Sequence, residues 1–490
     1  MLNYLKQESN FTATENGALT HTSSQSDCLD LFFRSGGMRE ADRGEIETVV
    51  LRAYAENPLT AMRILFYIRD VRGGLGERRF FRIAMETLAA HAPDAVRRNI
   101  GLFAEYGRFD DLCVLLGTAC EPDALRVIAQ QLREDYAAME AGKPASLLAK
   151  WLPSVNASSA KTCAAGKRIA RAMHMTEKQY RKMLSALRQY TDIIENRLRV
   201  SDYTFRYEAQ TSGAMFKYRK AFIRNDETRY TEYLNAVQKG EATMHAGTLY
   251  PYEIVQRCLR FGARQPLTAE ERLSLDTAWK SLPAYGSGSE NALAVIDGSG
   301  SMYRQTSPSP ISAALSLGIY FAEHNRGAFA NHFITFSARP QLVEIKGQDI
   351  FEKVQYCARY HEVANTDLEA VFLLILRTAV RNRLPQSEMP AKLFIISDME
   401  FDFCVTGGNQ MTLFDAMQKL YRQNGYTLPQ IVFWNVASRQ ENIPVTRSQT
   451  GAALVSGASP SVFDVVINGK TTPEAIMYSV VERERYMIIS

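Results

Sequence analysis

A cluster of hard oxygen donors follows the first apolar run in the second half of the chain. The run Leu293–Ile296 leads directly into Asp297, Ser299 and Ser301, which alternate with two glycines. Such a run is typical of a buried parallel strand, and the glycines let one carboxylate and two hydroxyls turn toward one point. Because these oxygens suit Mg2+ or Mn2+, the segment predicts a divalent-cation site. A plain Gly-Ser turn is the alternative.

Two later segments supply further side chains of the ligand type. The apolar run Lys392–Ser397 also ends in an acid, Asp398, and Thr366 lies just before a helical pattern that begins at Asp367. Because parallel strands end at one edge of a sheet, acids that follow two such strands are expected to lie close together. The predicted site therefore extends beyond one loop.

This pattern resembles the von Willebrand factor type A domain with its metal-ion-dependent adhesion site. That family places Asp-x-Ser-x-Ser after the first strand, a Thr on a later loop and an Asp after the fourth strand. The resemblance implies bound Mg2+ (or Mn2+) whose ligands are Asp297, Ser299, Ser301, Thr366 and Asp398. It also implies that an Asp or Glu of a partner protein can complete the coordination, which would make the domain a protein-interaction module.

A metal-dependent hydrolase is the least favoured hypothesis for the same residues. A hard cation beside hydroxyls can activate a water molecule, but the sequence offers no obvious general base. The seven histidines are dispersed and show no HExxH spacing. Glu400 and Asp402 are the only further acids close to the predicted site, and we interpret them as groups that orient ligands or cap the loop. The chain is therefore predicted not to be an enzyme.

Length and composition indicate an ordinary globular protein with more than one domain. The chain has 490 residues, of which 46% are hydrophobic and 22% charged, and one core rarely serves so long a chain. Its seven cysteines are scattered and form no CxxC pair, which favours reduced thiols. No apolar segment approaches the length of a membrane span. We therefore expect a cytoplasmic, monomeric protein that does not enter a membrane.

Three segments of the chain differ in pattern. Residues 1–30 are rich in polar side chains and are expected to form an irregular arm. Residues 31–282 repeat helical patterns with brief turns, which predicts an α-helical repeat array of the HEAT-like type without a fixed repeat length. A linker rich in Gly and Ser precedes residues 290–490. There, strand and helix patterns alternate as in a doubly wound α/β domain with a parallel sheet.

The apolar periodicity places the individual elements. Helices of the array are expected at 45–56, 58–71, 77–90, 94–105, 109–118, 121–141, 144–152, 160–174, 177–199, 226–238, 250–260 and 268–281. The stretch between 199 and 226 is less regular. Strands of the α/β domain are expected at 292–296, 331–337, 341–345, 392–397, 430–436 and 452–456.

Two glycine-containing segments are better explained as turns than as binding loops. The run Gly73–Gly76 follows a helical pattern rather than a strand and lacks the Gly-Lys-Ser/Thr ending of a phosphate loop. It is predicted to end one helix, with Glu77 opening the next. The segment 106–111 is likewise predicted to be a turn between helices.

A strongly basic segment lies within the predicted array. Between Lys161 and Arg224 the net charge is +10, whereas the whole chain carries +4. Aromatic residues from Tyr190 to Tyr218 interleave with these cations, and cations beside exposed rings suit a nucleic-acid surface. The alternative is a solvated helix face whose aromatic residues belong to the core. The residues predicted to bind RNA are Lys167, Arg168, Arg171, Lys178, Arg181, Lys182 and Arg188.

Several strings extend the resemblance to most of the chain. They are RDVRGGLGERRFF, YGRFDDL, AKWLPS, ISDMEFDF, NGYTLPQIVFWNV and GAALVSGAS. They are similar to those of a largely uncharacterised family that distantly resembles the Ro 60 kDa autoantigen and its bacterial homologues. The resemblance implies a TROVE-like helical array that binds small non-coding or misfolded RNA. Closure of the array into a ring, with the A domain joining its two ends, is a separate hypothesis. The RNA-contacting residues of Ro proteins are not transferred, because the helical halves do not align residue by residue.

Overall fold

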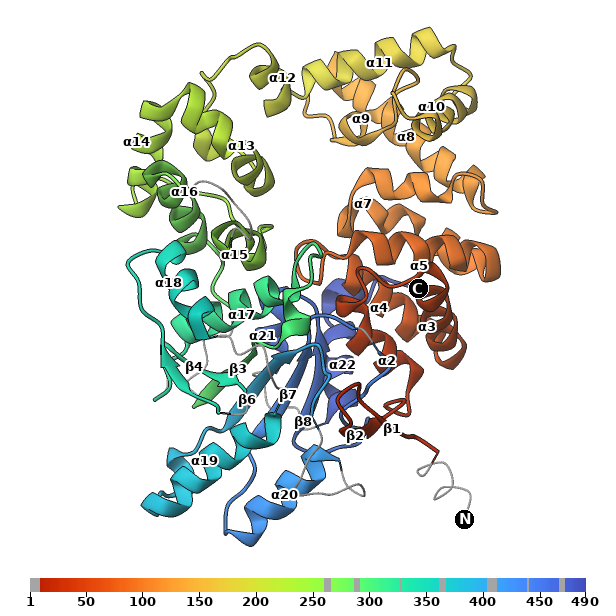
Figure 1. Ribbon diagram of the computed structural model, residues 1–490. Coiled ribbons are helices and arrows are strands. Elements are labelled where there is room, and N and C mark those ends of the chain that lie inside the picture. The colour runs from red at the N-terminus through yellow and green to blue at the C-terminus, as the bar shows by residue number, and fades with distance from the viewer. Residues whose placement is uncertain are drawn as a thin grey trace.

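The computed structural model shows a long helical array followed by a six-stranded α/β domain (Figure 1). No helix among the described residues is both long and apolar enough to span a membrane. The structure describes residues 9–259, 266–285, 291–326, 328–337, 339–360, 367–402, 412–438, 440–466 and 472–490.

The array consists mostly of short helices, and several of them have a side-chain cap at the N-terminal end. Asn57, Ser159, Thr176 and Thr268 each accept a hydrogen bond from a backbone N–H in the first turn of a helix, which satisfies a donor that the helix itself leaves unpaired. The helices are α2 (Asp27–Arg34), α3 (Arg43–Glu56), α4 (Pro58–Arg69), α5 (Arg78–His91), α6 (Pro93–Asn99), α7 (Phe103–Tyr106), α8 (Glu121–Glu140), α9 (Leu148–Trp151), α10 (Ala160–Ala172), α11 (Glu177–Tyr190), α12 (Ile194–Arg199), α13 (Ser212–Asn225), α14 (Glu227–Gln238), α15 (Pro251–Leu259) and α16 (Ala269–Lys280).

The array differs from the prediction in several places. The helix expected at 94–105 is divided into α6 and α7, and the helix expected at 109–118 is a 3-10 helix over Phe109–Leu115. The helix expected at 177–199 is two helices, since the chain turns at Asp192, whose φ is 43°. Helix α13 was not predicted because Arg219, which is buried, occupies a position where an apolar residue would mark the helical period. The arm expected to be irregular contains an antiparallel hairpin of β1 (Phe11–Ala13) and β2 (Leu19–His21), and α2 begins within it.

The sheet of the α/β domain has the order β5-β4-β3-β6-β7-β8. Its strands are β3 (Ala292–Asp297), β4 (His332–Phe336), β5 (Leu342–Glu344), β6 (Lys392–Ser397), β7 (Gln430–Asn435) and β8 (Ala452–Ser456). All neighbouring strands are parallel except β5, which runs antiparallel to β4. The sheet is therefore mixed, whereas a wholly parallel sheet was predicted. Strands β3 and β6 in the middle of the sheet are buried throughout, as expected for a sheet covered on both faces. The edge strand β8 is buried as well, because α2 and α22 (Pro473–Val481) pack against it.

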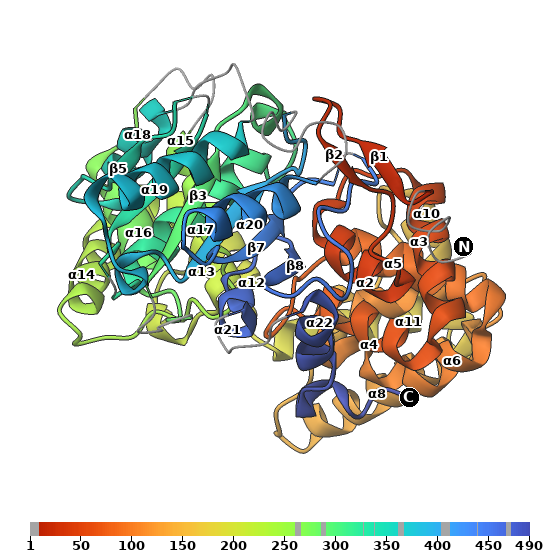
Figure 2. The same cartoon turned by 90° about the horizontal axis from the view of Figure 1, so that it is seen from below.

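Helices cover the sheet on both sides. In Figure 1, α17 and α21 lie above the sheet, toward the helical array, whereas α19 and α20 lie below it. Figure 2 shows α22 between β8 and the first helices of the array. The helices of this domain are α17 (Pro310–His324), α18 (Ile350–Cys357), α19 (Leu368–Asn382), α20 (Leu413–Gln423), α21 (Phe463–Val466) and α22 (Pro473–Val481).

Both ends of the array contact the α/β domain. At the first end, α2 packs against β8, and the Ser456 hydroxyl donates to the Phe32 carbonyl at 3.0 Å. At the last end, α15 and α16 pack against α17 and α18, and Arg272 is paired with Asp349 at 2.6 Å. The array is therefore an arc that begins and ends on the α/β domain (Figure 1). Closure of the arc around a central hole stays a prediction.

The last residues of the chain return to the first helices of the array. Asp70, which is fully buried at the end of α4, accepts hydrogen bonds from Arg485 at 2.9 Å and from the Tyr486 hydroxyl at 3.0 Å. The Ser490 amide donates to Asn99 Oδ1 at 3.0 Å. The segment after the sheet therefore attaches to the array as well.

Both glycine-containing segments are turns between helices, as predicted. The turn after α4 brings Leu75 against Gly457 of the loop that follows β8. In the turn at 106–111, the buried Asp111 carboxylate accepts from Arg69 Nε and from Arg82 Nε, both at 2.7 Å. Arg69 is also buried, so this ion pair joins α4 to the turn inside the core.

We predict that Asp111→Ala strongly destabilises the protein. The substitution would leave the buried Arg69 guanidinium without its carboxylate, and breaking a buried ion pair on one side costs about 3–5 kcal/mol. The midpoint of thermal unfolding should fall by several degrees. Asp94→Ala is the control, because Asp94 pairs with Arg97 but is 79% exposed, and exposed pairs contribute little. Equal midpoints for the two variants would contradict the prediction.

Candidate functional site

The predicted metal loop lies at the carboxyl end of two neighbouring strands. Strands β3 and β6 are adjacent and parallel, with Ile296 opposite Ile396. The acids that follow these positions, Asp297 and Asp398, therefore leave the sheet at the same edge. Both side chains are almost completely buried. The structure thus brings together carboxylates that lie about one hundred residues apart in the sequence.

Hydroxyl groups surround Asp297. The Ser397 hydroxyl donates to Asp297 Oδ2 at 2.6 Å, and the Ser299 backbone N–H donates to Asp297 Oδ1 at 2.9 Å. The hydroxyl oxygens of Ser299 and Ser301 lie 3.0 Å apart. Four of the five predicted ligands are thus in or beside one cluster, whereas Thr366 lies outside the described residues.

The electrostatics of this cluster favour a cation. Burial and the neighbouring Asp398 carboxylate raise the pKa of Asp297 to about 7, because both effects disfavour a second negative charge there. A divalent cation would stabilise both carboxylates in the charged form. Carboxylate and hydroxyl oxygens are also the donors that Mg2+ and Mn2+ prefer. Among the described residues no three His, Cys, Asp or Glu side chains are grouped to hold a metal, so the fit rests on two acids with hydroxyls.

The residues after Asp398 connect this loop to the β1–β2 hairpin. The Glu400 carboxylate accepts from Asn442 Nδ2 and from the Glu15 amide, both at 2.8 Å. The Thr14 hydroxyl donates to the Phe401 carbonyl at 2.6 Å. Glu400 therefore joins this loop to the hairpin tip and to Asn442, whereas its role beside a metal stays a prediction.

Two features of this loop were not recognised from the sequence. Ser397, the last residue of β6, is the hydroxyl that holds Asp297, and its place directly before Asp398 could have identified it. Met399 has a φ of 68°, which is uncommon for a residue other than glycine and is often found at binding sites. Nothing in the sequence predicted this backbone conformation.

We predict that the protein binds Mg2+ or Mn2+ and that Asp297→Asn abolishes this binding. At a metal concentration about 100 times the Kd, binding would stabilise the fold by about 2.7 kcal/mol. The affinity should rise as the pH rises through about 7, since protons compete with the metal for Asp297. Titration calorimetry and thermal unfolding with and without chelator measure both effects. Glu344→Gln, an exposed change on β5, should bind metal normally, and equal affinity in both variants would refute the site.

The predicted RNA-binding residues divide into two groups. Arg171, Lys178, Arg181 and Lys182 are exposed on α10 and α11, and none of the four forms an ion pair with another described residue. By contrast, Lys167 is paired with Glu177 at 3.1 Å, and Arg168 is paired with Glu121 at 2.8 Å. Only the first group, which we call the α10–α11 cation face, presents charges that are free to meet phosphates.

Arg188 does not belong to this face. Its guanidinium donates to the carbonyls of Ala149 and Leu152 at 2.7 and 2.8 Å and to the Ser154 hydroxyl at 2.9 Å. Burial lowers the pKa of Arg188. The inclusion of Arg188 among the RNA-binding residues is therefore corrected, because its donors are used to join α11 to the α9 turn.

Most of the aromatic residues near the basic segment are also structural. Phe205 and Tyr207 are buried and pack edge to face with Phe222, at ring-centroid distances of 5.9 and 5.2 Å. Tyr190 remains 37% exposed, and its hydroxyl donates to the Lys143 carbonyl. The expected stacking platform downstream of α11 is thus largely a core cluster that holds α13 and α14 together.

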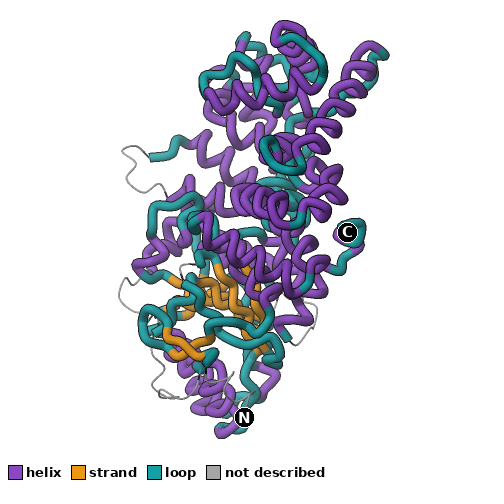
Figure 3. The backbone as a smooth tube through the Cα atoms, turned by 90° about the vertical axis from the view of Figure 1, so that its right-hand side faces the viewer, coloured by secondary structure: helices purple, strands orange, loops and turns teal. Residues whose placement is uncertain are grey.

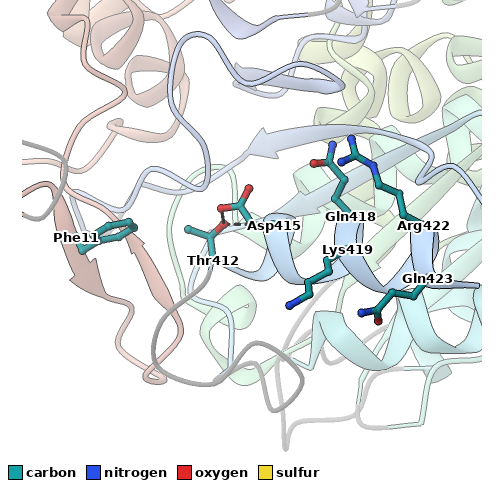
Figure 4. Close-up of a pocket in the computed structure, with 7 residues that line it drawn as sticks. All are labelled: Phe11, Thr412, Asp415, Gln418, Lys419, Arg422 and Gln423. Carbon is teal, nitrogen blue, oxygen red and sulfur yellow. Dashed lines mark hydrogen bonds between the residues drawn. The ribbon is translucent and has the colours of Figure 1, made fainter. Parts of the chain in front are cut away.

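A separate groove lies beside α20 and the first strand of the hairpin (Figure 4). Its volume is about 590 Å³, and its lining residues are Phe11, Thr412, Asp415, Gln418, Lys419, Arg422 and Gln423. Figure 4 shows Gln418 and Arg422 pointing one way along α20, whereas Lys419 and Gln423 point the other way. The polar groups along α20 therefore diverge.

Comparisons with known proteins match both the helical array and the α/β domain. Residues 14–125 and 123–283 match the family described as Domain of unknown function (DUF2828), and residues 291–486 match Domain of unknown function (DUF7788). An uncharacterized protein, L728, of Acanthamoeba polyphaga mimivirus is 28% identical over 96% of this chain and 87% of its own length. The RO (RSR) protein of Deinococcus radiodurans is similar in structure, with a TM-score of 0.45 and 14% identity over 90% of this chain and 99% of that chain.

Proposed function

This chain belongs to the family described as Domain of unknown function (DUF2828), and we propose that it is a non-enzymatic protein that binds RNA on its helical array. The observation that carries the proposal is the α10–α11 cation face, where four cations are exposed and not neutralised by described acids. Phosphate groups bind to such surfaces by displacing condensed counterions. Small non-coding or misfolded RNA is the proposed ligand.

The shape of the array supports this proposal. Helices α8 to α12 lie at the end of the molecule opposite the β1–β2 hairpin (Figure 1). Figure 3 shows that this end is built of helices and loops, whereas the strands lie toward the other end. The helices that carry the cation face therefore lie away from the sheet.

We predict that the triple substitution Lys178→Glu, Arg181→Glu and Lys182→Glu abolishes most of the RNA affinity. Each lost phosphate contact should lower the slope of log Kd against log salt by about one. Filter binding or fluorescence anisotropy with structured and single-stranded RNA at several salt concentrations measures this slope. Arg188 is left intact, because its loss would disturb the fold rather than the surface.

The matched control reverses three exposed cations at the end of α19. Arg377, Arg381 and Arg383 are exposed, so their change to Glu alters the net charge by the same amount on another surface. If both triple variants lose affinity equally, binding reflects overall charge and the proposed surface is wrong. If neither loses affinity, the protein does not use these cations for RNA.

A second candidate function is a metal-dependent interaction with a partner protein. The observation that favours it is the pair of buried acids beside Ser299, Ser301 and Ser397, which suits a cation whose coordination a partner carboxylate completes. The loop after Asp398 is also held in place by Glu400 and the hairpin. Mg2+ or Mn2+ is the proposed ion.

We predict that Asp297→Asn releases such a partner and leaves RNA binding unchanged. The partner should be captured from cell extract with Mg2+ and lost with chelator. Anisotropy with the same RNA measures the second property. A variant that loses RNA but keeps the partner would reverse the assignment of the two surfaces.

A further inference from the structure

We propose that the groove between α8 and α11 binds unpaired nucleotides of a single-stranded RNA, an inference that rests on the RNA-binding function proposed above. The groove has a volume of about 600 Å³, which is within the range of sites for small organic groups. It adjoins the α10–α11 cation face, since Lys182 belongs to both. Bases in the groove and phosphates on the cation face would therefore belong to one strand.

Two helix faces form the walls of this groove. On each helix the lining residues are spaced by three or four positions, which places them on one side of the helix. They are Arg133, Tyr136, Ala137 and Glu140 of α8 and Gln179, Lys182, Met183 and Ala186 of α11. Helices α8 and α11 contact each other, so the two faces meet at the bottom of the groove.

The lining is suited to flat aromatic groups. The Tyr136 ring is 38% exposed, and Met173 and Met175 from the turn between α10 and α11 are half-buried beside Met183. Aromatic side chains stack on bases whatever their identity, and thioethers make favourable contacts with aromatic rings. The groove therefore presents the apolar surfaces that an unstacked base needs.

Charge favours a nucleotide over a protein helix as the occupant. Arg133 on one wall and Lys182 on the other are exposed, and Glu140 lies at the last position of α8. An apolar groove that carries one cation on each wall matches a strand whose bases point inward and whose phosphates lie at the rim. An acidic amphipathic helix is the competing occupant, and the experiment below distinguishes the two.

The test compares a short oligouridylate with an RNA duplex of equal length. Tyr136→Leu should weaken binding of the oligouridylate about tenfold, because one stacking contact is lost, and should leave the duplex affinity unchanged, because its bases are paired. Tyr136→Phe should bind as the parent protein does. Unchanged oligouridylate affinity in Tyr136→Leu would overturn the proposal that the groove binds nucleotides and would favour a protein helix as its occupant. The proposed RNA-binding function of the array would still stand. Failure of the parent protein to bind either RNA would overturn both.

Methionine oxidation provides a second readout that needs no substitution. Bound oligouridylate should slow the oxidation of Met173 and Met175 by peroxide, because it would cover their thioethers. Met487, which is 54% exposed near the C-terminus, is the control and should oxidise at the same rate with and without RNA. Equal oxidation of Met173 and Met175 in both conditions would refute the proposal.

Discussion

The approach of two backbone segments fixes the helical array to the sheet. Gly36 follows α2. A Cβ atom at this position would lie 2.4 Å from the backbone nitrogen of Gly457, which is closer than a Cβ atom can approach. On the other side of Gly457, which has a φ of 95°, Leu75 fills the space. Glycine is thus required at both positions for steric and conformational reasons. This contact fixes the positions of α2 and of the turn after α4 relative to the sheet. The helices that follow in the array continue from these two elements.

The need to hold the layers of the molecule together also explains why the two glycine-containing segments are turns rather than binding loops. The turn at Gly73–Gly76 brings Leu75 to the sheet and Glu77 to Arg39, with which it forms an ion pair. The segment 106–111 delivers Asp111 to Arg69 in the core. Both segments combine glycines with charged residues, a composition that is also found in functional loops. Their burial shows that they stabilise the contacts between layers of the molecule.

The order of elements and the convergence of Asp297 and Asp398 at one sheet edge could be predicted because they depend on local patterns. Apolar runs that end in Asp297 and Asp398 specify parallel strands, and parallel strands end at one edge. The exposure of individual cations could not be predicted, because it depends on distant partners. Arg181 and Arg188 lie on one helix, but Arg188 meets carbonyls of a turn almost forty residues earlier, whereas Arg181 meets solvent. Helix α13 was missed for the same reason, since Arg219 is buried by tertiary packing.

The two proposed surfaces lie too far apart to share residues. The cation face belongs to α10 and α11, whereas the metal loop contacts the β1–β2 hairpin at the other end of the molecule (Figure 1). Substitutions at distant sites without common partners act independently. The proposed RNA-binding charges on α10 and α11 and the proposed metal-binding acids at the sheet edge are therefore expected to act independently of each other. If both proposals are correct, the protein holds an RNA and a partner at once, provided that the arc of helices keeps its two ends on the α/β domain.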